Sequence, residues 1–295
     1  MLLIGEGSNL LLTGDYEGTV ITPEKRFDVR VTPCADDEDA VEIECWAGTV
    51  FDDFVAYAVA NGYHGVENLS LIPGEVGASA VQNIGAYGAE AQDVIVCVKA
   101  VEIATASEVV FSREECDYGY RQSRFKHEWR DRYLITSVVY RLRKTFEPRL
   151  DYGNIRAVLS RQGTERPDAA QLRDAIVAIR REKLPDPKEL GNAGSFFMNP
   201  IVPRSEYERL RALYADIPCY AIDDERVKIP AGWMIDRCGW RGRTVGNVGV
   251  HDRQALVLVN RGGATGSEVV ALCRAIQKDV SERFGIDIVP EVNVK

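Results

Sequence analysis

One serine sits in a setting that could support proton transfer. Ser195 follows small residues and precedes two aromatics in Gly191–Pro200, a loop that suits a proton donor or a hydrogen-bond donor to a substrate. It is not part of a GxSxG nucleophile elbow, and no histidine is close in sequence to activate it, which disfavours a hydrolase. A loop hydroxyl bonded to the backbone is the alternative interpretation.

Two further side chains, an arginine and a glutamate, could belong to an active site. Arg121 lies among aromatics and cations in Tyr118–Lys126, where its guanidinium could form a bidentate pair with a carboxylate. The alternative is a surface arginine on an exposed turn. Glu291 directly follows an apolar strand-like run, so it is either an active-site acid or part of a solvated terminus.

Glycine-rich segments could admit a ligand close to the backbone. Gly5–Leu10 follows an apolar run, and its glycines allow N–H groups to approach an anion. A leucine replaces the third glycine of the GxGxxG pattern and no clear helix follows, so a plain tight turn remains the alternative. The mostly uncharged stretch formed by Ile72–Ala78 and Gln82–Gly88 suits a pyrophosphate or a flavin ring edge, with a compact structural loop as the alternative.

The composition narrows the class of protein. The 295 residues carry a formal net charge of -9, which argues against nucleic acid as a main partner because phosphate binding needs clustered cations. Seven widely spaced cysteines without a CxxC indicate a reduced compartment, and three scattered histidines do not predict a metal site. No apolar stretch approaches the roughly 20 residues of a membrane span, and no signal peptide is recognisable.

The first half of the chain is rich in strand signals around one clear helix. The patterns predict strands over 41–46, 94–103 and 134–142 and a helix from Phe51 that ends at Asn61-Gly62. Thr49 is spaced from an acid at position 52 almost as in a capping box. Residues 69–93 are too rich in glycine to predict a helix.

The second half alternates helices and strands. A helix over 168–183 ends before two prolines, which makes 184–189 a candidate boundary. A helix over 267–284 has a capping box from Thr265 and Glu268 and a stop at Gly285, and a short strand is expected over 286–289. The fold class is therefore α+β with mixed sheets.

Together, the motifs resemble the UDP-N-acetylenolpyruvoylglucosamine reductase (MurB) family, in its tyrosine-loop subtype. The segments GEGSNLL, IPGEVGASAVQNIGAYGAE, YGYRQSRFK, KLPDPKELGNAGSFFMNP, AGWMIDRCG and PEV follow that family's order over nearly the whole chain. The resemblance implies an FAD-binding domain of the vanillyl-alcohol-oxidase (PCMH) type and a C-terminal α+β substrate-binding domain. Other FAD-linked oxidases or dehydrogenases share the FAD loops more loosely and remain the alternative enzyme.

The resemblance also implies the reaction and its residues. FAD, reduced by NADPH, would deliver hydride to the enolpyruvyl group of UDP-N-acetylglucosamine enolpyruvate, giving UDP-N-acetylmuramate for peptidoglycan synthesis. Ser195 matches the proton donor, and Arg121 and Glu291 match the pair that polarises the substrate carboxylate. The positions that match substrate contacts are Tyr87, Tyr152, Lys183, Asn199, Tyr220 and Gln254. Those that match FAD contacts are Gly5, Glu6, Gly7, Ser8, Asn9, Leu10, Ile72, Pro73, Gly74, Gly77, Ala78, Gln82, Asn83, Ile84, Gly85 and Gly88.

The division into domains follows from the same resemblance. Family members usually carry several tens of residues before the GEGSN motif, so residues 1–23 are expected to be a remnant of the first FAD-binding subdomain. The FAD-binding domain is expected over 24–184, the substrate domain over 185–290, and a tail with Glu291 over 291–295. A monomer in the cytoplasm is expected, and a shortened remnant without catalysis is the remaining alternative.

Overall fold

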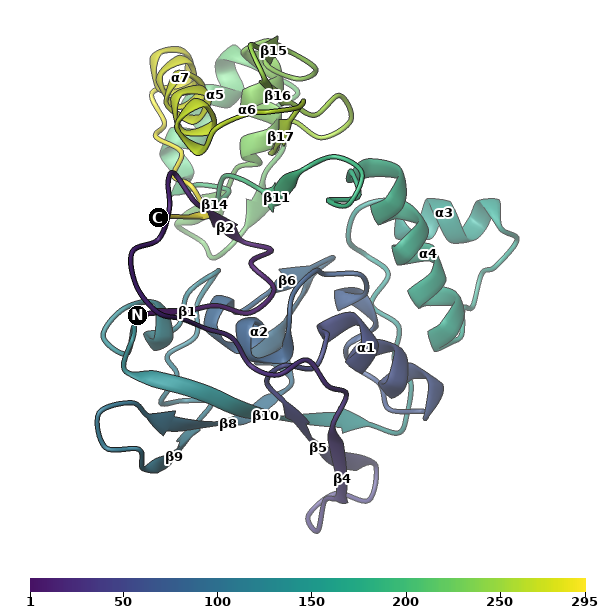
Figure 1. Ribbon diagram of the computed structural model, residues 1–295. Coiled ribbons are helices and arrows are strands. Elements are labelled where there is room, and N and C mark those ends of the chain that lie inside the picture. Colours follow the sequence, from purple (N-terminus) through teal and green to yellow (C-terminus); the bar gives the residue numbers. More distant parts are fainter. The chain divides into compact units, whose positions relative to one another are not determined.

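The computed structural model describes residues 1–295 and separates them into two units. Unit 1 comprises Met1–Ser8 and Glu17–Glu182, and unit 2 comprises Asn9–Tyr16 and Lys183–Lys295. Each unit combines helices with sheets, which confirms the α+β class (Figure 1). The expectation of mixed sheets is wrong, because the three larger sheets are antiparallel and parallel pairing is confined to two short pairs.

Unit 1 is built on a five-stranded antiparallel sheet in the order β4-β5-β10-β8-β9. Its strands are β4 (Val29–Pro33), β5 (Ala40–Trp46), β8 (Ile95–Glu102), β9 (Glu108–Ser112) and β10 (Tyr133–Arg143). Apolar residues at alternate positions of β5 and β10 are buried, because successive side chains of a strand point to opposite faces. The three strands predicted in this region are confirmed.

Two helices lie along one face of this sheet, α1 (Phe51–Ala60) and α2 (Val76–Gln82) (Figure 1). Phe51 and Phe54 of α1 pack against Tyr140, which is fully buried on β10. The helix from Phe51 is thus confirmed, but the capping expectation is wrong. The Thr49 hydroxyl donates to the Arg26 carbonyl oxygen at 3.0 Å instead, and α1 has no side-chain cap.

Helix α2 overturns the expectation that 69–93 contains no helix. Gly77 is the only glycine in α2 and lowers its helix propensity, whereas the alanines favour a helix. A Cβ added at Gly77 would lie 3.0 Å from Cβ of Ala47. The small residue therefore allows a close approach of α2 to the end of β5. The Ser79 hydroxyl and the Tyr140 hydroxyl lie 2.7 Å apart and share a buried hydrogen bond, which fixes α2 on the sheet.

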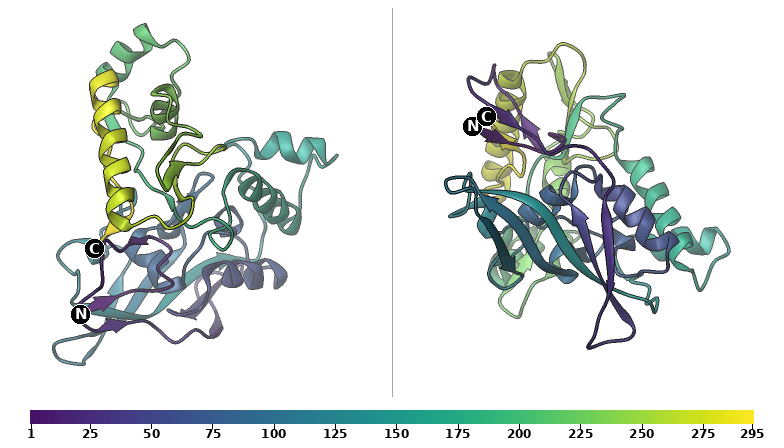
Figure 2. Two further views of the ribbon diagram at one scale, coloured as in Figure 1. Left: turned by 45° about the horizontal axis from the view of Figure 1, so that its top comes forward. Right: turned by 60° about the horizontal axis from the view of Figure 1, so that its bottom comes forward.

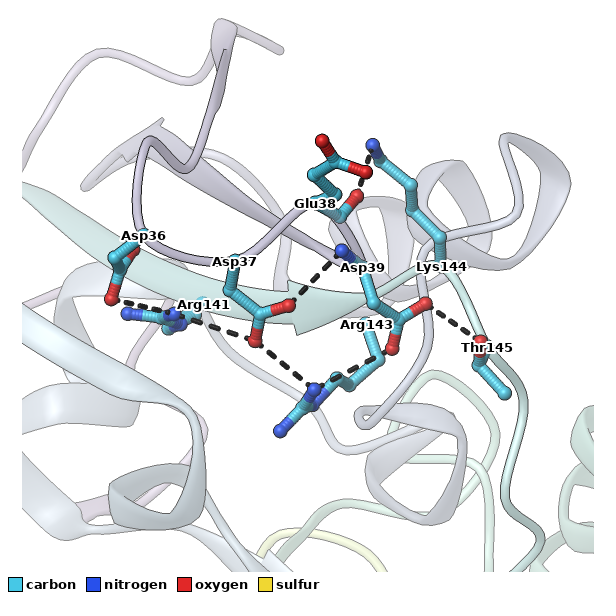
Figure 3. Close-up of polar contacts among 8 residues, drawn as sticks. All are labelled: Asp36, Asp37, Glu38, Asp39, Arg141, Arg143, Lys144 and Thr145. Atoms are coloured by element: carbon cyan, nitrogen blue, oxygen red, sulfur yellow. Dashed lines mark hydrogen bonds and ion pairs between the residues drawn. The ribbon is translucent and has the colours of Figure 1, made fainter.

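An acidic turn between β4 and β5 is fixed to the end of β10 by arginines (Figure 3). Arg141 contacts Asp36 at 3.0 Å, and Arg143 contacts Asp37 at 3.1 Å and Asp39 at 3.5 Å. The β4–β5 hairpin projects from the sheet (Figure 2), so these exposed pairs are screened by water. They hold the tip of the hairpin in one position rather than supplying much stability.

The remaining elements of unit 1 are short except for one helix pair. They are β1 (Leu2–Leu3), β3 (Val20–Ile21), η1 (Glu67–Leu69), β6 (Gly85–Ala86), β7 (Ala89–Glu90), η2 (Ala91–Asp93), η3 (Arg124–Lys126), α3 (Ile155–Arg161) and α4 (Ala169–Lys183). Helices α3 and α4 share a small apolar cluster, and Asp168 caps α4 by accepting the Gln171 N–H at 2.8 Å. The helix predicted over 168–183 is confirmed.

Unit 2 contains two antiparallel sheets, β11-β17-β16-β15 and β12-β14-β13. Its strands are β2 (Leu10–Leu11), β11 (Asn192–Ser195), β12 (Ile201–Pro203), β13 (Tyr220–Ala221), β14 (Arg226–Lys228), β15 (Thr244–Val245), β16 (Val248–Val250), β17 (Val257–Asn260) and β18 (Asn293–Val294). Its helices are α5 (Arg204–Leu213), α6 (Ala231–Arg237) and α7 (Gly266–Phe284). Strand β2 pairs in parallel with β18, which brings Leu10 opposite Asn293.

Helix α7 confirms the clearest local prediction in the chain. Thr265 and Glu268 form the expected capping box, and Gly285 ends the helix in a left-handed conformation with φ of 70°. The strand expected over 286–289 does not form; Ile286 and Ile288 are instead buried as irregular chain in the core of unit 2. No helix is long and apolar enough to cross a membrane, and all seven cysteines are free thiols.

Candidate functional site

Of the predicted cofactor residues at the N-terminus, Gly5–Ser8 form a glycine turn in unit 1, whereas Asn9 and Leu10 belong to unit 2. A Cβ added at Gly5 would lie 2.7 Å from the Oε2 atom of Glu75, and one added at Gly74 would lie 3.0 Å from the Ser8 hydroxyl oxygen. The glycines therefore permit a close approach between Gly5–Ser8 and the loop before α2. Two of the predicted cofactor segments thus meet within one unit.

Glu75 is the one charged residue in the predicted loop Ile72–Ala78, and it is almost completely buried. It is 1% exposed, and neither carboxyl oxygen has a hydrogen-bond partner in the structure. Burial raises the pKa of Glu75 to about 7, with the negative charge of Glu6 adding to the rise and Lys25 opposing it. The sequence interpretation passed over this residue, although a lone acid in an uncharged glycine-rich loop was its signal.

Much of the backbone in this loop is already satisfied by protein groups. The N–H of Val76 donates to the Thr49 carbonyl oxygen, and that of Gly77 donates to the Ala47 carbonyl oxygen, each at 2.9 Å. These two donors are directed to the end of β5 and not outward. The donors available to a ligand in this region are therefore fewer than the glycine content alone indicates.

Arg121 is held against the second predicted cofactor segment. Its Nη2 donates to the Gly85 carbonyl oxygen at 2.5 Å, and its Nη1 donates to the Asn83 carbonyl oxygen at 3.3 Å. The residue has a positive φ of 56°, and its side chain is 16% exposed. A Cβ at Gly85 would lie 2.8 Å from Nη1, so only glycine allows the guanidinium to lie this close. The predicted catalytic arginine is thus hydrogen-bonded directly to the Gln82–Gly88 loop.

Asn83, also predicted to contact the cofactor, acts inside the protein. Its side chain is fully buried and donates to the Gly119 carbonyl oxygen at 2.8 Å and to Glu90 at 2.9 Å. Its Oδ1 accepts the N–H of Gln92 at 3.0 Å. The side chain therefore positions the loop beside Arg121, since its amide hydrogen bonds are all made with the protein.

Two predicted substrate tyrosines lie together in unit 1. The rings of Tyr87 and Tyr152 meet edge to face, with centroids 6.4 Å apart. Asn68, buried to 3% exposure, donates to the carbonyl oxygens of Tyr87 at 2.8 Å and Arg149 at 3.0 Å, which joins the two tyrosine-bearing segments. Burial lowers the pKa of Arg180 on α4, and the nearby Tyr87 offsets part of this effect. Sequence patterns gave no indication of Asn68.

Ser195 and Glu291 lie on neighbouring segments in unit 2. Ser195 ends β11 and is paired with Val257. The next residue, Phe196, accepts the backbone N–H of Glu291 at 2.8 Å. Asn9 adds a third segment, because its side-chain amide donates to the Glu291 carbonyl oxygen at 3.3 Å. Two of the three predicted catalytic residues are therefore fixed in one unit, and Arg121 belongs to the other.

The remaining predicted substrate residues also belong to unit 2. Asn199 accepts the N–H of Ala231 at 2.9 Å through its Oδ1, and a Cβ at Gly232 would lie 3.3 Å from Oε1 of Gln254. Both amide side chains therefore border the first turn of α6. Tyr220 is 39% exposed and lies opposite Lys228 on β14, and Lys183 is exposed at the end of α4.

Two sequence profiles match the chain. Residues 1–112 match the FAD binding domain, and residues 186–295 match the C-terminal domain of UDP-N-acetylenolpyruvoylglucosamine reductase.

Similar proteins include two curated reductases and one solved structure. The UDP-N-acetylenolpyruvoylglucosamine reductase of Bacteroides fragilis is 54% identical over 99% of this chain and 86% of its own length. That of Paraburkholderia phytofirmans is 50% identical over 98% of this chain and 84% of its own length. The crystal structure of the Thermus caldophilus reductase covers 99% of this chain and 84% of its own, with a TM-score of 0.64 and 21% identity, which supports the fold.

Proposed function

Because the chain belongs to the UDP-N-acetylenolpyruvoylglucosamine reductase family, an FAD-dependent and NADPH-driven family, we propose that Ser195, Arg121 and Glu291 carry its chemistry. The reaction reduces the enolpyruvyl group of UDP-N-acetylglucosamine enolpyruvate. Bound FAD supplies the hydride, which originates from NADPH. The protein's own task is to stabilise the charge that develops beside the substrate carboxylate and to deliver one proton.

Ser195 delivers that proton. Hydride addition to one carbon of the enolpyruvyl group leaves negative charge on the adjacent carbon, delocalised into the carboxylate. A hydroxyl is a weak acid, but this carbon is a strong base, so transfer from Ser195 is downhill. Arg121 and Glu291 act on the carboxylate, where charge accumulates mainly in the transition state.

The observation that supports this assignment most directly is the backbone link between Ser195 and Glu291. The N–H of Glu291 bonds to the carbonyl oxygen of Phe196 at 2.8 Å, one residue beyond the serine. Two groups proposed to act on adjacent atoms of one substrate are thereby held on adjacent segments. A backbone hydrogen bond between the two segments keeps such groups in place better than free loops would, which favours a reaction sensitive to geometry.

The glycine turn and Glu75 fit the cofactor. FAD carries an extended diphosphate, which needs hydrogen-bond donors and close backbone approach, and Gly5–Ser8 offers both. The unpartnered carboxyl of Glu75 beside Gly5 is a buried polar group that a bound ligand would satisfy. Gly5–Leu10, Ile72–Ala78 and Gln82–Gly88 are proposed to hold FAD.

The substrate itself is proposed to contact six side chains. Its UDP end would meet most of them, with Lys183 supplying a local cation and Tyr152 closing over the bound molecule. The proposed set is Tyr87, Tyr152, Lys183, Asn199, Tyr220 and Gln254. On this proposal, residues 24–184 form the FAD-binding domain and 185–290 the substrate domain. The protein acts as a monomer in the cytoplasm, which sizing by light scattering and cell fractionation would check.

Replacement of Ser195 by alanine tests the assignment. Ser195→Ala should leave reduction of bound flavin by NADPH unchanged and slow its re-oxidation by substrate by about 10²-fold or more, the usual contribution of a positioned acid. Stopped-flow absorbance of the flavin separates the two half-reactions. Ser205→Ala, at an exposed serine of α5, is the control and should leave both rates unchanged.

An unchanged re-oxidation rate in Ser195→Ala would remove this serine from the mechanism. A slowed reduction by NADPH together with a slowed re-oxidation would indicate a damaged flavin site instead of a lost proton donor. Ser195→Cys, which restores an acidic hydrogen at the same position, should recover part of the lost rate.

A further inference from the structure

Glu75 has an environment that the reduction chemistry does not explain. Its side chain is 1% exposed and both carboxyl oxygens lack a partner in the protein. A buried polar group without a hydrogen bond destabilises the folded protein, and does so more strongly when it is charged. Glu75 precedes α2, yet its side chain makes no capping hydrogen bond to that helix. The carboxyl group is thus buried without a hydrogen bond in the folded chain.

The position of the carboxyl group indicates a ligand. The Oε2 atom lies where it would be only 2.7 Å from a Cβ at Gly5, so it borders the backbone of the glycine turn. The Ser8 hydroxyl stands in the same relation to Gly74, at 3.0 Å. Two polar side-chain groups, one from each loop, therefore lie where Gly5–Ser8 and the loop before α2 approach each other closely.

We propose that Glu75 remains protonated when FAD binds and donates its O–H to the cofactor's diphosphate, so that binding of FAD takes up a proton. The inference rests on the assignment of the FAD loops given above and is independent of Ser195, Arg121 and Glu291. An ionised carboxylate at this position would repel the diphosphate, whereas the neutral acid supplies a hydrogen bond to a charged acceptor.

The charged groups around Glu75 favour its neutral form. Glu6 lies in the glycine turn and adds negative charge, while Lys25 opposes it but is itself paired to Glu6 at 2.6 Å. Burial is the largest cause of the shift that brings the pKa of Glu75 to about 7 in the FAD-free protein. A diphosphate beside it would raise this pKa further, because it adds like charge.

The pH dependence of FAD affinity tests the proposal without any turnover. The dissociation constant of the full-length protein for FAD is measured from flavin fluorescence between pH 6 and pH 9. It should be constant below about pH 7 and then rise about tenfold per pH unit until the higher pKa of the complex is reached. Titration calorimetry in buffers of different ionisation enthalpy should show uptake of up to one proton per FAD at pH 8.

Glu75→Gln keeps the shape and a hydrogen-bond donor but cannot ionise. Its FAD affinity should not change with pH in this range, should exceed that of the wild type at pH 9, and should involve no proton uptake attributable to this site. Glu17→Gln, at an exposed glutamate of the same unit, is the control and should keep the wild-type pH profile.

Three results would overturn the proposal. They are an FAD affinity of the wild-type protein that does not vary with pH, an absence of proton uptake at pH 8, and a Glu75→Gln variant whose pH profile matches the wild type. The wild-type calorimetry decides the question even if the variant does not fold. Loss of turnover in Ser195 variants with normal FAD binding would leave this inference intact, so the two proposals fail separately.

Discussion

The backbone N–H of Glu291 donates to the carbonyl oxygen of Phe196 over 2.8 Å, and Asn9 donates to the carbonyl oxygen of Glu291 over 3.3 Å. The main chain at Glu291 is therefore fixed from two sides by bonds that do not involve its carboxylate. A substitution at Glu291 should therefore leave these backbone bonds in place, so it tests the function proposed for the side chain.

Glu291→Gln should preserve the fold and reduce turnover. The amide has nearly the same shape and keeps the backbone bonds, but it lacks the carboxyl group proposed to act on the substrate carboxylate. A loss of about 10²-fold in kcat is expected from removal of one preorganised electrostatic group. The measurement is steady-state NADPH oxidation, with thermal unfolding as the check on the fold. A variant with full turnover would rule out a catalytic role for Glu291.

Arg121→Lys should impair turnover nearly as much as Arg121→Ala. The guanidinium uses one fork to reach the carbonyl oxygens of Gly85 and Asn83 together, and a single ammonium cannot reproduce that geometry. The expected loss in kcat/KM is about 10²-fold or more for both variants. Arg130→Lys, at an arginine whose side chain is 50% exposed, serves as the control. Near-normal activity of Arg121→Lys would show that charge alone suffices.

Glu75→Gln should change the pH dependence of stability in FAD-free protein. The pKa of Glu75 is raised from 4.5 to about 7 by folding, so between these values the folded state keeps a proton that the unfolded state has lost. Stability of the wild type should therefore fall as pH rises through this range and level off above about pH 7. The total change is about 3 kcal/mol. Urea unfolding at pH 5 and pH 8 measures it, and equal pH profiles for variant and wild type would contradict the raised pKa.

Gly266→Ala should destabilise unit 2. A Cβ at Gly266 would overlap the carbonyl oxygen of Leu12, and both sides of this contact are backbone that cannot move independently. Overpacking of this kind costs about 1–3 kcal/mol. Gly14→Ala is the matched control, because a Cβ there meets nothing within 4 Å. The midpoint of thermal unfolding should be lower for Gly266→Ala than for Gly14→Ala. Equal midpoints would contradict the contact between Leu12 and the start of α7.

Local signals in the sequence predicted the elements that local interactions form. The capping box of Thr265 and Glu268 and the stop at Gly285 defined α7, because all three act within one or two turns of the helix. Alternation of apolar residues likewise predicted β5, and runs of β-branched and aliphatic residues predicted β8 and β10.

Features that depend on distant residues were missed. Helix α2 forms in a glycine-containing stretch because Gly77 packs on Ala47 and Ser79 bonds to Tyr140, and neither partner is near in sequence. Thr49 bonds to the carbonyl oxygen of Arg26 instead of capping α1 for the same reason. Glu75 was overlooked because burial, which gives it its properties, is decided by the whole unit.

The pairing of β2 with β18 has a consequence for biosynthesis. The hydrogen bond from the Asn293 side chain to the Asn9 carbonyl oxygen joins residues 284 positions apart. On a ribosome, Asn9–Tyr16 emerges long before the strand that it pairs with, and it must remain unpaired while the intervening chain is translated. Unit 2 is therefore expected to acquire its last backbone ladder only late in synthesis, at the moment when Glu291 also reaches its neighbours.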